Sequence, residues 1–234
     1  MNIIVTGASR GIGYALVKQF ASTNNSSILA VARNGKQLAK LSEECKKINS
    51  SSDVAIMPLD LSKSGASDIV VDWVVKSKNK IDILINNAGL LINKPFVELT
   101  EDDFDNLFHT NVKSVFCLSQ ALINHFNNPA HIVNIASMGG VQGSVKFSGL
   151  SLYSASKGAV AILTEALAEE LKERNIKVNC LAFGAVQTEM FAEAFPKYNA
   201  PLQPKEMAEF VADFAKKGGH FFNGKILSVS TSTP

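Results

Sequence analysis

Cysteine, charge of one sign and long apolar runs are all scarce in this sequence. Its 234 residues include three cysteines, too few and too widely separated to suggest a disulfide framework or a thiolate metal site. The 23 Lys and Arg residues against 21 Asp and Glu leave a net charge of +2, which argues against nucleic-acid binding. No stretch approaches the roughly 18 continuous apolar residues of a membrane-spanning helix. We therefore expect a globular protein that binds neither nucleic acid nor membrane.

Two further absences concern location and metals. The N-terminus lacks a basic segment followed by a long apolar stretch, so we expect no signal peptide. Unpaired cysteines fit a reducing compartment, and the expected localisation is cytoplasmic. The four histidines show no ligand spacing, so no metal site is predicted.

Seven short apolar runs recur along the chain. They are apolar at both alternating positions, which is typical of strands covered on both faces. The runs span residues 2–6, 27–32, 53–59, 82–86, 131–136, 176–182 and 225–230. Their alternation with helical stretches predicts an α/β fold of the Rossmann type, a doubly wound, mostly parallel seven-stranded sheet with helices on both faces. Because the alternation is unbroken, residues 1–234 are predicted to form a single domain.

Helical spacing of apolar residues marks several segments between these runs. The predicted helices cover residues 35–48, 67–78, 154–174 and 204–217. Another helix is predicted to begin at Thr100, whose side chain can cap it and which is followed by acidic residues in the first turn. Pro204 suits the first turn of the last helix.

A glycine-rich turn directly follows the first predicted strand. Gly7, Gly11 and Gly13 in TGASRGIG lead into a helix, which is the setting of a dinucleotide phosphate loop. Glycines at this place let the backbone approach a pyrophosphate at the helix N-terminus. Their G-x-x-x-G-x-G spacing differs from the commoner G-x-G-x-x-G, and a glycine turn without a ligand is the alternative.

Two tyrosine–lysine pairs share a spacing of four residues. Because residues i and i+4 lie on one helix face, Lys157 can approach Tyr153 and Lys18 can approach Tyr14. A nearby ammonium lowers the pKa of a phenol from about 10 and so favours proton exchange at neutral pH. Spacing alone does not separate the two pairs. We expect Tyr14 and Lys18 to lie on the solvated surface, because the apolar side of their helix faces the sheet.

Five motifs in a fixed order give the sequence a family resemblance. TGASRGIG is followed by NNAG (86–89), by HTNV with Asn111, by HIVNIAS ending at Ser137, and by YSASK with Tyr153 and Lys157. In this set and order the chain resembles the short-chain dehydrogenase/reductase family over nearly its whole length. The resemblance implies an oxidoreductase that interconverts a carbonyl and a secondary alcohol, with hydride from a nicotinamide cofactor.

The same resemblance assigns four catalytic residues. It makes Tyr153 the acid/base, and it gives Lys157 the tasks of tuning that phenol and holding the nicotinamide ribose. Ser137 orients the substrate oxygen, and Asn111 supports a proton-relay water, although a mid-helix Asn bonded to backbone is an alternative. Two other functions stay open, a non-catalytic NADP-binding sensor and an epimerase or dehydratase.

The residues after the second predicted strand bear on the choice of cofactor. No acidic residue follows that strand, whereas Arg33 does, and Arg10 lies in the glycine loop. A guanidinium suits the 2′-phosphate of NADP(H) in charge and geometry. Asp60 is expected near the adenine, with a helix-capping role as the alternative. By resemblance, the cofactor contacts are Gly7, Ser9, Arg10, Gly11, Ile12, Gly13, Arg33, Asp60, Leu61, Asn87, Ala88, Gly89, Tyr153, Lys157, Gly184, Val186 and Thr188.

Three departures from the family pattern concern the substrate, a small carbonyl or alcohol compound. The segment 138–152 is longer than usual and is expected to bulge at the substrate mouth. Phe183 precedes Gly184 where the family has Pro-Gly. The substrate loop near 189–204 is short, and its aromatics either wall an apolar pocket or simply pack together. The resemblance also makes a homodimer or homotetramer a reasonable expectation.

Overall fold

A computed structural model describes residues 1–23 and 26–231 of the chain. Its strands are β1 (Asn2–Thr6), β2 (Ser27–Ala32), β3 (Asp53–Pro58), β4 (Ile81–Asn86), β5 (Phe126–Ser137), β6 (Ile176–Phe183) and β7 (Ile226–Val229). Its α-helices are α1 (Gly11–Ala21), α2 (Gly35–Ile48), α3 (Ala66–Ser77), α4 (Glu101–Phe108), α5 (Ser114–Leu122), α6 (Ser151–Glu170), α7 (Glu189–Ala194) and α8 (Pro204–Phe221). Its short turns are the 3-10 helices η1 (Phe96–Glu98), η3 (Ile123–His125), η4 (Met138–Gly140) and η5 (Lys172–Arg174), and the π-helical turn η2 (His109–Lys113).

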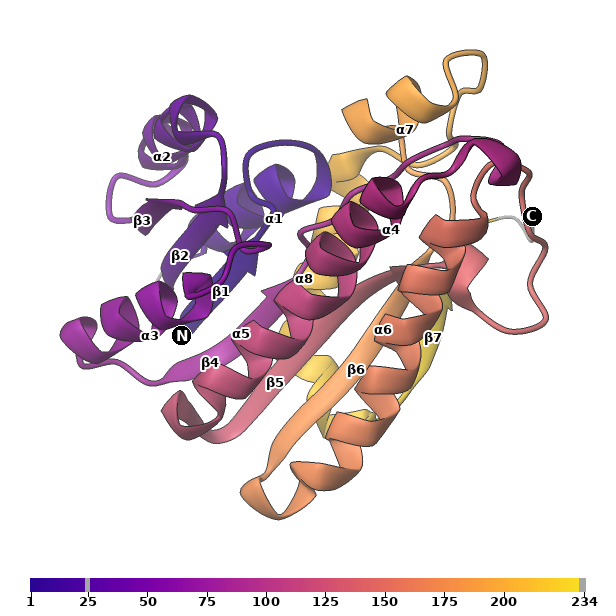
Figure 1. The fold of residues 1–234 in the computed structure, drawn as a ribbon. Coiled ribbons are helices and arrows are strands. Elements are labelled where there is room, and N and C mark those ends of the chain that lie inside the picture. The colour runs from indigo at the N-terminus through magenta and orange to yellow at the C-terminus, as the bar shows by residue number, and fades with distance from the viewer. Residues whose placement is uncertain (24–25, 232–234) are drawn as a thin grey trace.

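The strands form one sheet in the order β3-β2-β1-β4-β5-β6-β7 (Figure 1). Each neighbouring pair of these strands is parallel, so the sheet is more regular than the mostly parallel arrangement that the sequence predicts. The strand order reverses direction between β1 and β4. In an open α/β sheet, ligands bind at the carboxyl ends of the strands beside such a reversal. The fold therefore places a binding cleft beyond Thr6 and Asn86.

The alternation of side chains along the strands explains why helices cover both faces. Ile3 and Val5 point to one face and pack with α1, α2 and α8. Ile4, between them, points to the other face and packs with α3, α5 and α6. Figure 1 shows these two helix layers with the sheet between them. The predicted doubly wound fold is confirmed.

Local capping sets where the helices begin. Thr100 accepts a hydrogen bond from the Asp103 amide at 3.1 Å, and the Asp103 carboxylate accepts one from the Thr100 amide at 3.0 Å. This reciprocal capping box confirms the predicted start of α4. The helix predicted at 154–174 instead begins at Ser151. Tyr153 consequently lies in the first turn of α6.

A buried histidine joins an inner strand of the sheet to α8. His131 on β5 contacts the Ala215 carbonyl through Nδ1 at 3.0 Å and the Asn179 side-chain nitrogen through Nε2 at 3.0 Å. A carbonyl only accepts and an amide nitrogen only donates, so Nδ1 carries the proton and the ring is neutral. Burial lowers the pKa of His131 to about 4. The imidazole therefore acts as an uncharged structural link.

No helix within residues 1–23 and 26–231 has both the length and the apolar character needed to cross a membrane.

Candidate active site

The glycine loop between β1 and α1 has the backbone geometry of an anion site. Gly7 and Gly11 have φ angles of 69° and 57°, in the left-handed region that favours glycine. Arg10 is the N-cap of α1 and makes no side-chain capping hydrogen bond, and no acidic residue lies in the first turn. The first amides of an α-helix lack intrahelical partners, and the helix dipole favours negative charge there. These residues fit a dinucleotide pyrophosphate.

The loop is held against β4 by the residues after that strand. The Thr6 hydroxyl accepts hydrogen bonds from the amides of Asn87 and Ala88, both at 3.0 Å, and Asn87 Nδ2 donates to the Thr6 carbonyl at 2.9 Å. A Cβ on Gly7 would lie 2.7 Å from the Ala88 Cα, and one on Gly13 would lie 2.3 Å from the Gly7 carbonyl oxygen. Only glycine at these two positions allows the loop, α1 and β4 to approach so closely.

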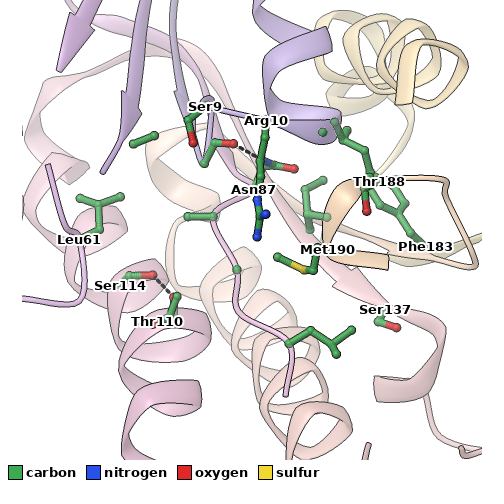
Figure 2. Close-up of a pocket in the computed structure, with 18 of the residues that line it drawn as sticks. Ser9, Arg10, Leu61, Asn87, Thr110, Ser114, Ser137, Phe183, Thr188 and Met190 are labelled. Carbon is green, nitrogen blue, oxygen red and sulfur yellow. Dashed lines mark hydrogen bonds between the residues drawn. The ribbon is translucent and has the colours of Figure 1, made fainter. Parts of the chain in front are cut away.

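One cleft at the carboxyl ends of the strands collects nearly all the predicted site residues (Figure 2). The predicted catalytic residues that line it are Ser137, Tyr153 and Lys157. The other lining residues among those predicted for the cofactor are Gly7, Ser9, Arg10, Gly11, Ile12, Arg33, Asp60, Leu61, Asn87, Ala88, Gly89, Gly184, Val186 and Thr188. Gly13 packs beneath the loop, and Asn111 lies behind the cleft wall. The individual roles of all these residues stay predictions.

One end of the cleft carries Arg33 and Asp60 at the ends of neighbouring strands. Asp60 Oδ1 accepts hydrogen bonds from the Ser62 amide at 3.0 Å and the Ser62 hydroxyl at 2.7 Å. Partial burial raises the pKa of Asp60, but these two bonds and the positive charge of Arg33 outweigh it and hold the pKa below its usual value. Asp60 thus closes a turn, while Gly65 occupies the N-cap of α3, so the capping alternative does not hold.

The other end of the cleft carries Ser137, Tyr153 and Lys157. The Lys157 ammonium donates to the Ile135 carbonyl at 2.9 Å and lies 5.9 Å from the centroid of the Tyr153 ring. Burial lowers the pKa of Lys157 to about 8. Burial also raises the pKa of Tyr153 to about 12, with a smaller opposing effect from a hydrogen bond to Ser137. The expected lowering of the phenol pKa is not found here, because burial raises it.

Asn111 connects the cleft wall to the helix that bears Tyr153. Its Oδ1 accepts from the Leu90 amide at 2.7 Å, and its Nδ2 donates to the Leu90 carbonyl and to Ser156 Oγ, both at 2.9 Å. Ser156 in turn donates to the Tyr153 carbonyl at 2.7 Å. Both Nδ2 hydrogens are thus donated to protein groups, which agrees with the alternative in which Asn111 is a mid-helix Asn bonded to backbone. Asn111 fixes the start of α6 relative to the segment after β4, and its support of a relay water stays a prediction.

A chain of buried polar side chains continues beneath the cleft. Asn86 Nδ2 donates to Asn134 Oδ1 at 2.8 Å, and Asn134 Nδ2 donates to the Thr164 hydroxyl at 2.9 Å. The three residues lie on β4, β5 and α6, and each is almost fully buried. Such a chain stabilises one relative placement of these three elements because each donor would otherwise lose its partner.

The second tyrosine–lysine pair lies outside the cleft. Lys18 forms an ion pair with Glu44 on α2 at 2.7 Å. Partial burial and a hydrogen bond to Glu44 raise the pKa of Tyr14 to about 12. The prediction that this pair is solvated surface is wrong, because α2 packs against this side of α1 and half-buries both side chains. The pair has a structural setting and no Ser or Asn partner comparable to Ser137.

The long segment after Ser137 does not line the cleft. Among the described cleft-lining residues, none falls between 138 and 150. Its polar groups bond within the segment, as Lys146 does to the Val141 carbonyl at 2.7 Å, and Gly149 docks on Lys94 through a backbone hydrogen bond of 3.0 Å. The segment forms an irregular loop that folds on itself and packs on the loop after β4, and its expected position at the substrate mouth stays a prediction.

Apolar side chains instead come from the loop after β6 and from Leu91. Met190 and Phe191 of α7 line the cleft together with Phe183, as Figure 2 shows for Met190 and Phe183. Phe191 contacts Phe195 and Tyr198, with ring centroids 5.1 and 5.8 Å apart. Both sequence alternatives hold in part, because Phe191 reaches the cleft and the other two rings pack behind it.

Hydrogen bonds between the two ends of the loop after β6 hold it in place where the family has a proline. Gln187 donates its amide to the Leu202 carbonyl at 2.8 Å, and its side chain accepts from the Ala200 amide at 2.7 Å. Thr188 caps α7 by accepting from the Phe191 amide at 3.1 Å. The chain after Phe183 is thereby ordered without a Pro-Gly pair.

Several cleft residues escape sequence reasoning. Leu91, Thr110, Ser114 and Met190 line the cleft, and the Ser114 hydroxyl donates to the Thr110 carbonyl at 2.6 Å (Figure 2). Thr110 lies within the HTNV motif, Ser114 follows that motif by two residues, and Met190 follows Thr188 by two residues. Proximity to a recognised motif is the one signal that could have suggested them.

Comparisons with known proteins agree with this geometry. A family model described as short chain dehydrogenase matches residues 1–199. The chain is 33% identical over 190 residues to 3-oxoacyl-(acyl-carrier-protein) reductase of Chlamydia pneumoniae, covering 80% of this chain and 74% of that protein. It is 33% identical over 193 residues to carbonyl reductase (NADPH) 2 of Sus scrofa, covering 81% and 73%. A short-chain dehydrogenase from Burkholderia cenocepacia, solved in complex with NADP, superposes with a TM-score of 0.89 at 28% identity, over 99% of this chain and 96% of that one.

Proposed function

We propose that this chain, which belongs to the short-chain dehydrogenase/reductase family, is an NADPH-dependent reductase that interconverts a carbonyl and a secondary alcohol. One observation carries the proposal. A single cleft holds the glycine loop and two arginines toward one end, and Ser137, Tyr153 and Lys157 toward the other. A cofactor whose phosphates occupied the first end would extend its nicotinamide toward the second.

The positive charge of two arginines is the basis of the proposed preference for NADPH. Arg10 and Arg33 line the cleft, and the single acidic residue at the neighbouring strand ends, Asp60, is turned toward Ser62. A guanidinium matches a phosphate by charge and by its fork of donors, whereas an acid after β2 would match free ribose hydroxyls. The NADP-bound relative from Burkholderia cenocepacia and the NADPH-named reductase of Sus scrofa support the same choice.

The residues at the catalytic end have complementary roles in this proposal. NADPH, when bound, supplies a hydride to the carbonyl carbon. The Ser137 hydroxyl donates a hydrogen bond to the carbonyl oxygen and so stabilises the charge that grows there. Tyr153, protonated at neutral pH because its pKa is about 12, gives its proton to that oxygen. The Lys157 ammonium, 5.9 Å from the ring centroid, favours the phenolate that remains.

The side chains near Ser137 point to the class of substrate. Leu91, Met190 and Phe191 are apolar, and the charged side chains that line the cleft, apart from Glu189, belong to residues assigned to the cofactor. Among the described residues that line this end of the cleft, the cation that a substrate carboxylate would meet is Lys157, which is buried and already bonded to the Ile135 carbonyl. The proposed substrates are uncharged ketones or aldehydes with an apolar substituent.

Steady-state assays of NADPH oxidation test this function. The purified protein would be given uncharged alkyl and aryl ketones, and matched keto acids, with NADPH or NADH. We expect turnover of the uncharged compounds, and kcat/KM with NADPH at least about tenfold above that with NADH, since a charge-assisted hydrogen bond contributes roughly 1.5–3 kcal/mol. Equal or better kcat/KM with NADH contradicts the cofactor preference.

A non-catalytic NADP-binding sensor is the rival function. A sensor needs the glycine loop and the arginines but has no use for a phenol, a serine and a lysine at the opposite end of the cleft. Saturable NADPH binding without turnover of any carbonyl in the panel would favour the sensor. The observed grouping of Ser137, Tyr153 and Lys157 favours the reductase.

A further inference from the structure

An ion pair links the glycine loop to the helix that borders the substrate end. Arg10 Nη1 lies 2.8 Å from Glu193 Oε1 on α7, although the two residues are 183 positions apart in the sequence. Most other ion pairs of the described chain join neighbours on one helix or adjacent segments. This pair therefore sets a tertiary contact between two elements that both line the cleft.

The contact places acidic groups against an anion site. Glu189 and Glu193 lie one helical turn apart on α7, and the Glu189 carboxylate comes within 3.6 Å of where a Cβ on Gly11 would be. Thr188, at the N-cap of α7, is closer still to Gly11, with its Cγ2 at 3.2 Å from that point. The other end of α7 is held by Asn93, whose side chain donates to the Ala194 carbonyl at 2.9 Å. Helix α7 thus spans from the phosphate loop to the segment that carries Leu91.

Arg10 has two possible anionic partners in this arrangement. Its own side chain is 47% exposed and that of Glu193 is 65% exposed, so water and salt screen the pair strongly. A 2′-phosphate carries nearly twice the charge of a carboxylate and offers three acceptor oxygens to the same fork of donors. The phosphate is the stronger partner, and the carboxylate next to it would be repelled.

We propose that Glu193 is a cofactor-selectivity residue that competes with the 2′-phosphate of NADPH for Arg10. The proposal rests on the proposed NADPH preference. Binding of NADPH transfers Arg10 from Glu193 to the phosphate and releases the tether on α7. NADH lacks the phosphate, so the Arg10–Glu193 pair persists when NADH binds. Glu193 thereby weakens NADPH binding and leaves NADH binding unchanged.

Calorimetric titration of the whole protein with NADPH and with NADH tests the competition without requiring turnover. Because exposed ion pairs contribute about 0.2–1 kcal/mol, Glu193→Gln and Glu193→Ala are each expected to tighten the Kd for NADPH by roughly 1.4- to 5-fold. The Kd for NADH should stay within experimental error of the wild type. The gain for NADPH should shrink at high ionic strength, where the pair is already screened.

Asp213→Asn supplies the matched control. Asp213 is 63% exposed, pairs with Lys217 on α8, and does not line the cleft, so its replacement makes the same change in net charge without touching Arg10. A gain in NADPH affinity shared by this variant would assign the effect to net charge and overturn the proposal. Unchanged or weaker NADPH binding by both Glu193 variants would also overturn it. Wild-type protein that binds NADPH no better than NADH would instead refute the cofactor preference itself.

Discussion

The Lys157 ammonium lies 5.9 Å from the centroid of the Tyr153 ring and hydrogen-bonds the Ile135 carbonyl. The phenol is therefore influenced by a charge near its ring rather than by a direct hydrogen bond to lysine. Burial keeps the phenol protonated and at the same time brings the pKa of Lys157 down to about 8. Burial thus moves the two pKa values in opposite directions, up for Tyr153 and down for Lys157.

Replacement of Tyr153 by Phe tests proton donation directly. Removal of the hydroxyl is expected to lower kcat by about 10²- to 10⁴-fold, the usual contribution of general acid catalysis. NADPH oxidation would be measured with the best ketone of the panel, and calorimetry would verify that NADPH still binds. Tyr14→Phe is the matched control, because Tyr14 has the same spacing to a lysine but bonds Glu44, and its kcat should be unchanged. Activity of Tyr153→Phe within tenfold of wild type would refute the assignment.

The titration of Lys157 predicts the alkaline limb of the pH–rate profile. Its pKa is lowered to about 8, so the ammonium is present below that pH and is lost above it. Ketone reduction at saturating NADPH is therefore expected to decline above pH of about 8, approaching tenfold per pH unit. Lys157→Met should lack this limb and have a low rate throughout. A wild-type kcat that stays constant well above that pH would show that the charge on Lys157 is not needed.

His131 predicts how the stability of the fold depends on pH. Its folded pKa of about 4 lies below the unfolded value of about 6.5, so the unfolded chain binds the proton more readily. The contribution of the neutral His131 imidazole to the unfolding free energy is complete above about pH 6.5. It is lost as the pH falls toward 4, by roughly 3 kcal/mol in all. Urea unfolding at neutral pH and at about pH 5 should differ by about 2 kcal/mol.

Two histidine variants separate this effect from other titrations. His131→Gln removes the titrating group, so its unfolding free energy should change much less over the same interval. His220→Gln, at an exposed site on α8, should keep the wild-type dependence. An equal pH dependence in His131→Gln and wild type would assign the effect to other groups.

Glycine variants test the close packing beneath the phosphate loop. A Cβ at Gly13 would collide with the Gly7 carbonyl oxygen, so Gly13→Ala is expected to cost about 1–3 kcal/mol of unfolding free energy and to weaken NADPH binding. Gly143→Ala is the control, because Gly143 has a φ of 81° but open space around it. It should cost about 1 kcal/mol and leave NADPH binding intact. Equal NADPH affinity in the two variants would contradict a role for Gly13 packing in the cofactor site.

Local sequence patterns predict the helices and strands well because the interactions that form these elements join residues close in the sequence. The predicted helix 35–48 matches α2 residue for residue, because its apolar spacing lies within the range and Asn34, directly before it, caps the first turn. Thr100 and Asp103 predict a helix start because they cap each other across three positions. Three of the five motifs likewise locate the cleft, because TGASRGIG, NNAG and HIVNIAS lie at the carboxyl ends of β1, β4 and β5, which the parallel sheet places side by side.

Several features that the sequence does not predict depend on partners that are remote in the sequence. Tyr14 is half-buried because Glu44 and α2 pack on it, and nothing near Tyr14 indicates this. The Tyr153 pKa is governed by burial, which depends on the whole cleft rather than on the spacing to Lys157. The Arg10–Glu193 pair spans most of the chain. Such contacts arise from packing, which periodicity and motifs do not contain.

The buried chain from Asn86 through Asn134 to Thr164 has a consequence for strand registration. Slippage of β5 by one residue would turn Asn134 to the opposite face and leave the Asn86 amide without its acceptor, so the amides disfavour misaligned pairing. Ser137 lies three residues further along β5, and each residue of a parallel strand advances about 3.3 Å. The asparagines therefore determine where along the cleft β5 presents Ser137, its last residue.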